Sequence, residues 1–261
     1  MKTLVLAAAL LGAPAPAVPL PEAPAAVAAT LEQTTAELEA AIDRWQGGPR
    51  AGGATPRDVT LWGLHQQRLF LALTYDETLG RRAWPLLGRE ARATLTARRR
   101  LVSLTPPTKL PPSAFRTGPA APAASLLRWY REAERRFGVE WEVLAAVNFV
   151  ESGFGRLRSS SSAGAQGPMQ FLPATWRAYG LGGDVHDPRD AILGAANYLR
   201  ASGATRDLRR ALYAYNHSTR YVDAVAAFAA QLRREPRIYF AYHSWQVFIK
   251  TPAGPRRITG P

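Results

Sequence analysis

Apolar residues recur along this chain mostly at the spacing of an α-helix. In the first third, four of them form a stripe that stops at a Gly-Gly-Pro sequence: Leu31, Leu38, Ile42 and Trp45. Positions three, four and seven residues apart share one face of a helix, which gives the helix a side to bury. Two more helical patterns follow, over about residues 57–79 and 84–102. Together they predict a small N-terminal helical unit, and we find no catalytic constellation in it.

Helix boundaries are marked more clearly in the second half of the chain. We expect Ser125 to cap one helix and Asp187 to cap another whose first position is a proline. Between them, residues 141–152 are apolar nearly all round, which is typical of a helix surrounded by other helices. Two further helical faces follow, over residues 208–215 and 222–232.

The C-terminal tail has a different pattern. Residues 238–258 alternate aromatic and β-branched side chains on either side of the turn sequence Thr251–Gly254, which predicts a short β-hairpin. The expected fold is therefore all-α, with a short hairpin at the C-terminal end.

Proline-rich stretches separate these parts and suggest domain boundaries. We divide the chain as follows: residues 1–17, a signal peptide; 18–24, a Pro/Ala spacer; 25–104, an N-terminal helical domain; 105–123, a Pro-rich linker; 124–235, a second helical domain; and 236–261, an aromatic hairpin and tail.

The N-terminus predicts export. Lys2 precedes an apolar run over residues 3–11 that is too short to span a bilayer as a stable anchor. Ala15 and Ala17 are the small residues that a signal peptidase accepts, so we expect cleavage after Ala17. We expect no transmembrane segment in the mature chain, because no later stretch is apolar enough. The chain has no cysteine, which excludes disulfides and a lipid-modified cysteine after the signal.

The chain is strongly basic. Its 261 residues carry a formal net charge of +13, with lysines at positions 2, 109 and 250 only, so that 30 of the 33 basic residues are arginines. Such an excess suits an anionic partner: nucleic acid, a membrane surface or an acidic cell-wall polymer. The arginines are dispersed and no nucleic-acid motif organises them, and export argues further against nucleic acid. An anionic wall polymer and a merely solvated basic surface both remain open.

Glu151 is a lone carboxylate at the end of the apolar segment 141–152. The C-terminal end of a helix disfavours negative charge, and apolar neighbours remove water, so both effects would raise the carboxyl pKa. A general acid that works near neutral pH needs such a shift. Arg156 and Arg158 would oppose it if they point inward, and the sequence leaves this open. By position alone, Glu151 also fits an exposed helix-end glutamate.

Three ordered motifs in the second half resemble those of a known family. Residues 151–176 read ESGFGRLRSSSSAGAQGPMQFLPATW, residues 187–199 read DPRDAILGAANYL and residues 214–216 read AYN. These are similar to the motifs of the soluble lytic transglycosylase (SLT) family, in particular its actinobacterial type. The resemblance covers about residues 124–235 and implies a goose-type-lysozyme-like catalytic domain there.

The resemblance also implies roles for single residues. Glu151 stands at the family's single catalytic acid. Five residues match positions that meet or shape the sugar cleft: Ser161, Met169, Gln170, Tyr215 and Asn216. Met169 and Tyr215 fit a packed core as well. The loop between Glu151 and Gln170 is one residue longer than the common pattern, and His217-Ser218 replaces the usual Ala-Gly.

The implied reaction cleaves the glycan strands of peptidoglycan, outside the cell membrane: in the cell wall, or in the periplasm if the cell has an outer membrane. Glu151 would first protonate the leaving oxygen at C1 of N-acetylmuramic acid and then deprotonate the C6 hydroxyl, leaving a 1,6-anhydro end. No metal or cofactor is expected, since His186 and His217 lack carboxylates at metal-ligand spacing. Two alternatives stay open. One is a hydrolase in which Asp184 or Asp223 activates water, and the other is a non-catalytic glycan-binding module.

Overall fold

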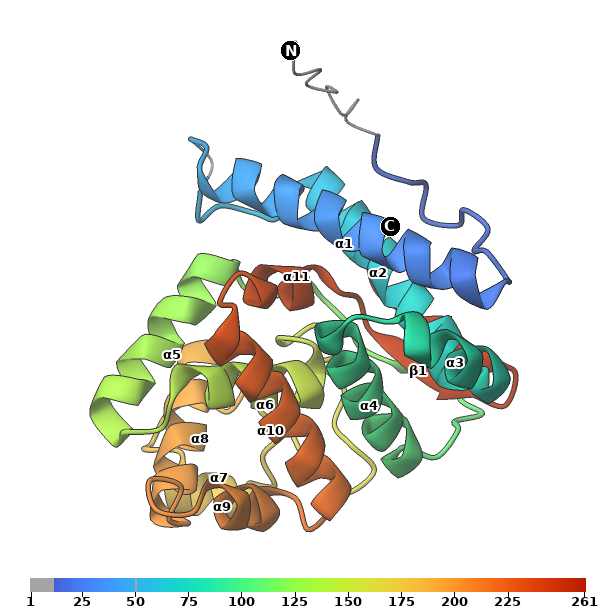
Figure 1. Ribbon diagram of the computed structural model, residues 1–261. Helices are drawn as coiled ribbons and strands as arrows, with labels where there is room; N and C mark the ends of the chain where they lie inside the picture. The colour runs from blue at the N-terminus through green and yellow to red at the C-terminus, as the bar shows by residue number, and fades with distance from the viewer. Residues whose placement is uncertain (1–11, 50) are drawn as a thin grey trace.

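The computed structural model describes residues 12–49 and 51–261 (Figure 1). Its first half holds four α-helices and a 3₁₀ turn: α1 (Pro24–Gln46), α2 (Arg57–Tyr75), α3 (Glu77–Ala83), the turn Trp84–Leu86 and α4 (Arg89–Leu104). After a second 3₁₀ turn at Pro112–Ala114 come seven more: α5 (Ala123–Phe137), α6 (Trp141–Ser152), α7 (Pro173–Tyr179), α8 (Pro188–Ala201), α9 (Leu208–Tyr215), α10 (Thr219–Arg234) and α11 (Ile238–Ser244). The chain ends in an antiparallel hairpin of β1 (Phe248–Thr251) and β2 (Gly254–Arg257). The predicted fold class is confirmed.

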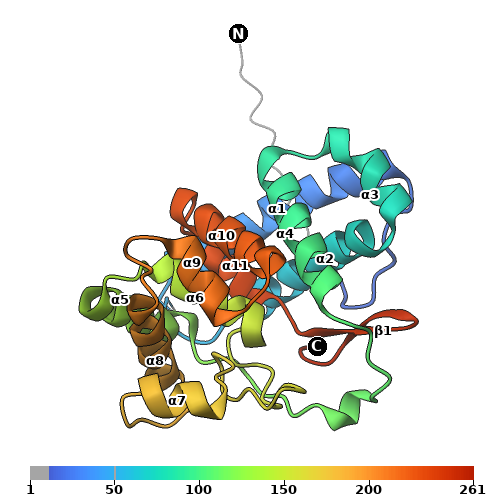
Figure 2. The same cartoon turned by 90° about the horizontal axis from the view of Figure 1, so that it is seen from below.

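Helix α6 is the centre of the second half. It packs against α5, α8, α10 and α11, which lie around it in both views (Figures 1 and 2). Seven of its first eight residues are buried. One of them, Asn148, is polar, and its side-chain amide donates to the buried Tyr130 hydroxyl at 2.7 Å. This confirms that the segment is apolar all round because helices surround it. Its packing gives the residues at its C-terminal end a fixed position.

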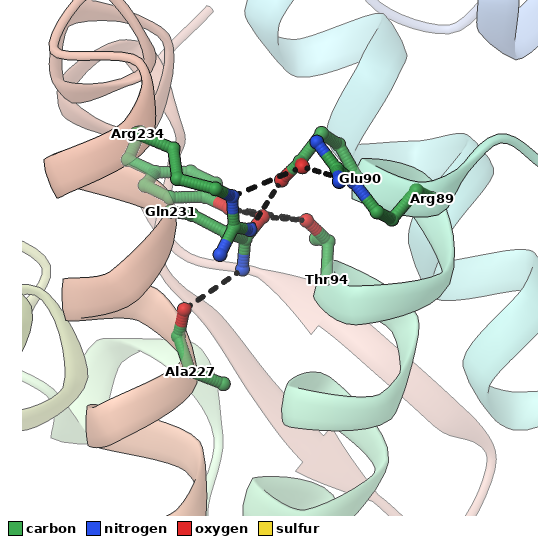
Figure 3. A network of polar contacts seen from close by, with 7 residues as sticks. Arg89, Glu90, Thr94, Ala227, Gln231 and Arg234 are labelled. Atoms are coloured by element: carbon green, nitrogen blue, oxygen red, sulfur yellow. Dashed lines mark hydrogen bonds and ion pairs between the residues drawn. The ribbon is translucent and has the colours of Figure 1, made fainter.

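Helix α4 joins the N-terminal helices to the second half by packing along α10 (Figure 3). At the solvent edge, the Arg234 guanidinium donates to both carboxylate oxygens of Glu90, at 2.8 and 3.2 Å. One turn deeper, the Thr94 hydroxyl donates to the side-chain oxygen of Gln231 at 2.7 Å, and both residues are buried. Buried polar groups cost free energy unless they are paired, so these contacts fix the register of α4 on α10.

Some predicted helix boundaries are wrong. The pattern over 57–79 is two helices, because Asp76 leaves the helical conformation and accepts a hydrogen bond from the Leu79 amide at 2.8 Å, which caps α3. The pattern over 84–102 starts too early, since α4 begins only at Arg89. Ser125 is not a cap either: α5 begins two residues before it, after Pro122. The Asp187 cap is confirmed by its bond from the Asp190 amide.

The C-terminal tail is only partly a hairpin. The strands and the turn at Thr251–Gly254 are confirmed, but residues 238–244 form α11 instead of extended chain. Its aromatic residues pack inward: Tyr239 is fully buried, and Tyr242 lies 5.0 Å from Phe149 of α6, ring centre to ring centre. Alternating aromatic residues are typical of a strand, but a short helix that is buried on both sides can carry the same pattern.

The predicted linker 105–123 is bonded to the rest of the chain at separate points. The Thr108 amide donates to the Lys250 carbonyl at 2.8 Å, and Thr117 forms a β-bridge with Leu157. The apolar part of the predicted signal peptide lies outside the described residues. Among the residues that are described, no helix is both long and apolar enough to cross a membrane.

Candidate active site

Glu151 is the next-to-last residue of α6, and its carboxylate is held by a tyrosine from another helix. The Tyr221 hydroxyl donates to Glu151 Oε1 at 2.7 Å. Gly153 then ends the helix in the left-handed conformation, at φ 60°. Phe154 also has a positive φ of 63°, which is uncommon for a residue with a side chain. The chain thus turns away at once, and Glu151 stays partly exposed.

Sequence reasoning missed Tyr221. It lies in the first turn of α10, four and seven residues before the buried Val225 and Phe228, so in sequence it belongs to the apolar stripe of that helix. The stripe is real and Tyr221 is buried, but its hydroxyl reaches past the core to Glu151. Ser218 caps α10 by accepting from the Tyr221 amide. The His217-Ser218 departure therefore supplies the cap of the helix that carries Tyr221.

The predicted rise in the pKa of Glu151 is confirmed. Burial of the carboxyl raises its pKa to about 7, and the hydrogen bond from Tyr221 opposes the rise because it stabilises the ionised form. Burial and the charge of Glu151 also raise the pKa of Tyr221 well above its ordinary value. The pair at neutral pH is therefore a neutral phenol that donates to a carboxyl near half-ionisation.

The two arginines that follow Glu151 leave its carboxyl uncompensated. Arg156 is buried, but its guanidinium donates to the carbonyls of Gly153, at 3.0 Å, and His243, at 2.6 Å. Arg158 is exposed and donates to the Pro119 carbonyl at 3.2 Å. Neither contributes to the pKa of Glu151. The question left open by the sequence is thus answered: Arg156 points inward, but away from the acid.

A tight loop over residues 166–171 is bonded to Ser152, the residue that follows Glu151. Gln166 and Phe171 exchange two backbone hydrogen bonds of 2.8 Å, which closes the loop. Gln170 has a left-handed φ of 50°, and its side-chain amide donates to the Gly167 carbonyl at 2.9 Å. A Cβ on Gly167 would lie 1.9 Å from the Val185 carbonyl oxygen, so only glycine fits there.

Two side chains tie this loop to the helices around it. The Ser152 hydroxyl donates to the Pro168 carbonyl at 2.5 Å, and the Tyr215 hydroxyl donates to the Met169 carbonyl at 2.7 Å. The Met169 side chain is fully buried, so here its backbone is what faces Tyr215. The charge of Glu151 helps to raise the pKa of Tyr215, after burial, which places that tyrosine close to the acid.

The two remaining candidates lie at the edge of this arrangement. Ser161 is exposed, and its hydroxyl accepts from the amides of Ala163 and Ala165 at 3.2 and 3.0 Å, which closes the serine-rich loop. Asn216 is exposed at the C-terminal end of α9 and shapes the turn into α10 through its backbone. Tyr215 is thus close to Glu151, Gln170 follows the Met169 whose carbonyl Tyr215 binds, and Ser161 and Asn216 make no contact with the acid.

Neither Asp184 nor Asp223, the two alternative bases, interacts with Glu151. Asp223 accepts from Arg209 at 2.5 Å on the outside of α10, and the Asp184 carboxylate accepts from the His186 amide at 2.8 Å. No carboxylate of the described residues contributes to the pKa of Glu151. Over the same ranges, no three His, Asp or Glu side chains are grouped to hold a metal ion. The site is a single acid that accepts a hydrogen bond from one tyrosine, Tyr221.

The raised pKa of Glu151 predicts how stability changes with pH. The folded carboxyl titrates near 7 and the unfolded one near 4.5, so the unfolded chain loses its proton first. The free energy of unfolding should therefore fall as pH rises from about 4.5 to 7. In Glu151→Gln the side chain cannot ionise. The free energy of unfolding of this variant, relative to that of the parent, should therefore rise by up to roughly 3 kcal/mol between pH 4 and pH 8. Urea unfolding at both pH values measures this, and an equal difference at both would contradict it.

Comparisons with known proteins point to one family. A 70-residue stretch is 36% identical to the membrane-bound lytic murein transglycosylase F of Thiobacillus denitrificans; it covers 27% of this chain and 14% of that protein's length. No solved structure matches the chain. Residues 128–235 match the model of the Transglycosylase SLT domain, whose fold is lysozyme-like. The part of the chain that holds all six candidate site residues thus matches the Transglycosylase SLT domain family.

Proposed function

We propose that this protein is a peptidoglycan lytic transglycosylase, which cleaves the bond between N-acetylmuramic acid and N-acetylglucosamine with Glu151 as its one acid and base. The observation that carries the proposal is the state of Glu151: a carboxyl of pKa about 7, bonded by Tyr221, within the segment that matches the SLT family. A non-catalytic binding module would have no need of an acid poised between its two protonation states.

The reaction follows from what one such carboxyl can do. Protonated Glu151 gives its proton to the glycosidic oxygen as the bond from C1 to that oxygen breaks. The substrate's own acetamido group stabilises the cation that develops at C1. The ionised Glu151, steadied by the Tyr221 hydroxyl, then takes the proton of the C6 hydroxyl as O6 bonds to C1. The acid returns to its starting state, the products are a 1,6-anhydro end and a free 4-hydroxyl, and no water is consumed.

The product distinguishes this reaction from hydrolysis. Glycosidases that use water pair the acid with a second carboxylate, and no such partner affects Glu151 among the described residues. Digestion of uncross-linked glycan in ¹⁸O-labelled water should therefore give muramyl ends that lack the label, weigh one water less than hydrolytic ends and resist borohydride. Labelled, reducible ends would replace the proposal by a muramidase. An absence of new ends while the protein sediments with the wall would replace it by a binding module.

We also propose that the protein acts outside the cytoplasm, in the cell wall or periplasm. The support is the N-terminal sequence, in which Lys2, the apolar run 3–11 and the small residues Ala15 and Ala17 have the order of a signal peptide. Mass spectrometry of the protein recovered from outside the cell should find an N-terminus at or near Val18. Recovery of chains that still begin at Met1 from the cytoplasm alone would contradict export.

A further inference from the structure

A cleft lined by arginines lies where α3, α4 and the start of α10 meet. Its volume is about 570 Å³, and seven residues line it: Arg81, Trp84, Thr96, Arg99, Arg100, Ser103 and Arg220. None of them is acidic. Another cavity, of about 940 Å³ between α1, α4 and α10, is different: its wall carries charges of both signs, with glutamates at 32, 39, 90 and 235 and arginines at 89, 234 and 237. The lining of the cleft differs from that of the other cavity because its four arginines have no acidic residue among them.

The arginines reach the cleft from three separate elements. Helix α4 supplies Arg99 and Arg100, together with the hydroxyls of Thr96 and Ser103, at spacings of three, four and seven residues that share one helix face. Arg81 comes from α3, and Arg220 is the second residue of α10. The cleft thus spans the junction between the N-terminal helices and the segment that matches the SLT family.

Little negative charge offsets these guanidinium groups. Arg100 Nε lies 3.7 Å from Asp223 Oδ2, and the same carboxylate already accepts from Arg209. Arg99 and Arg220 bond to neutral oxygens, the Leu73 carbonyl at 3.1 Å and Ser103 Oγ at 3.3 Å. Within the described ranges Arg81 makes no ion pair. One shared carboxylate therefore faces four arginines.

Part of the cleft is fixed in advance. Arg99 lies across Gly80 of α3, where a Cβ would come within 2.1 Å of its terminal nitrogen. The absence of a side chain at Gly80 lets Arg99 reach the carbonyl at the end of α2 and hold its position. A guanidinium that is already placed loses less entropy when it binds an oxyanion.

We propose that this cleft binds an acidic polysaccharide through its phosphate or carboxylate groups. Arginine pairs with both groups through two parallel hydrogen bonds, and several arginines on three elements suit an extended chain with repeated charges. The Trp84 indole and the two hydroxyls offer sugar rings an apolar surface and hydrogen-bonding groups. Arg220 directly precedes Tyr221, the residue bonded to Glu151, so the bound polymer would hold the protein with its candidate active site close by. This goes beyond the proposed cleavage, because it concerns attachment and not bond breaking.

The test compares two double variants that remove the same charge. Arg81→Gln with Arg220→Gln alters the cleft, while Arg57→Gln with Arg135→Gln alters exposed arginines on α2 and α5. Calorimetric titration would use phosphomannan and polygalacturonate as acidic polysaccharides, and dextran, inorganic phosphate and duplex DNA as comparisons. The cleft pair should weaken binding to an acidic polysaccharide at least about tenfold and make the plot of log K against log salt less steep by about 1.5. The control pair should stay within about twofold of the parent.

Other results would overturn the proposal. Equal weakening by both pairs would mean a diffuse basic surface, and duplex DNA bound more tightly through the same arginines would mean a nucleic-acid site. Saturation by inorganic phosphate with no binding of either acidic polysaccharide would mean a site for the free ion. Thermal unfolding of each variant identifies loss of fold. Glu151→Gln should bind the polysaccharide as the parent does, so a failure of the proposed cleavage would leave this result unchanged.

Discussion

Glu151→Gln should lose at least about 10³-fold in the rate of glycan cleavage while it still sediments with the cell wall. One carboxyl serves both proton transfers, and each positioned acid or base is worth roughly 10² to 10⁴. The glutamine side chain keeps an oxygen that can accept from Tyr221, so the hydrogen bond of 2.7 Å and the packing around it are preserved. Release of soluble fragments from purified wall measures the rate, and sedimentation measures binding.

Glu142→Gln is the matched control, since it makes the same change at the first turn of the same helix. The charges that act on Glu142 are those of Glu134, Glu140 and Arg233, and none of them belongs to the contact between Tyr221 and Glu151. Its replacement should therefore leave the rate of cleavage within a few-fold of the parent. If Glu151→Gln clears wall material nearly as fast as the parent does, the assignment of the acid is wrong.

Tyr221→Phe should lower kcat about tenfold and move the alkaline limb of the pH profile upward. The hydroxyl donates to the ionised form of Glu151, so its removal raises the pKa of that carboxyl further above its ordinary value. Glu151 must be protonated to begin the reaction, and activity in the parent therefore falls as pH rises through about 7. In the variant the fall should come at higher pH. The loss in kcat reflects one hydrogen bond to a charged group, worth roughly 1.5 kcal/mol or more.

Tyr213→Phe is the matched control, because it removes a hydroxyl from an exposed tyrosine on α9. Among the aromatic rings of the described residues, the Tyr213 ring contacts only that of His217. The substitution should change neither kcat nor the pH profile. A role of Tyr221 in packing alone would lower the amount of folded protein but leave the alkaline limb in place, and a limb that shifts to lower pH would contradict the direction of the hydrogen-bond effect.

Much of the fold follows from local sequence. The stripe from Leu31 to Trp45 and the apolar segment 141–152 each bury the faces that their spacing predicts, because burial of apolar side chains dominates the free energy of folding. The Asp187 cap and the hairpin turn at Thr251–Gly254 are local too, since both depend on backbone geometry within a few residues. Residues 238–244 were assigned wrongly because tertiary burial around α6, and not local pattern, makes them helical.

The candidate site divides in the same way. Sequence alone determined where the acid lies, at the end of a buried helix before a glycine turn, and the direction in which burial shifts its pKa. Only the tertiary structure decided what faces that acid. Tyr221 is 70 residues away along the chain and belongs to an apolar stripe, and the inward course of Arg156 toward the His243 carbonyl cannot be read from position. Periodicity reports which face of a helix is buried, whereas the partner of a polar group depends on how two helices cross, and that is set by packing between segments far apart in sequence.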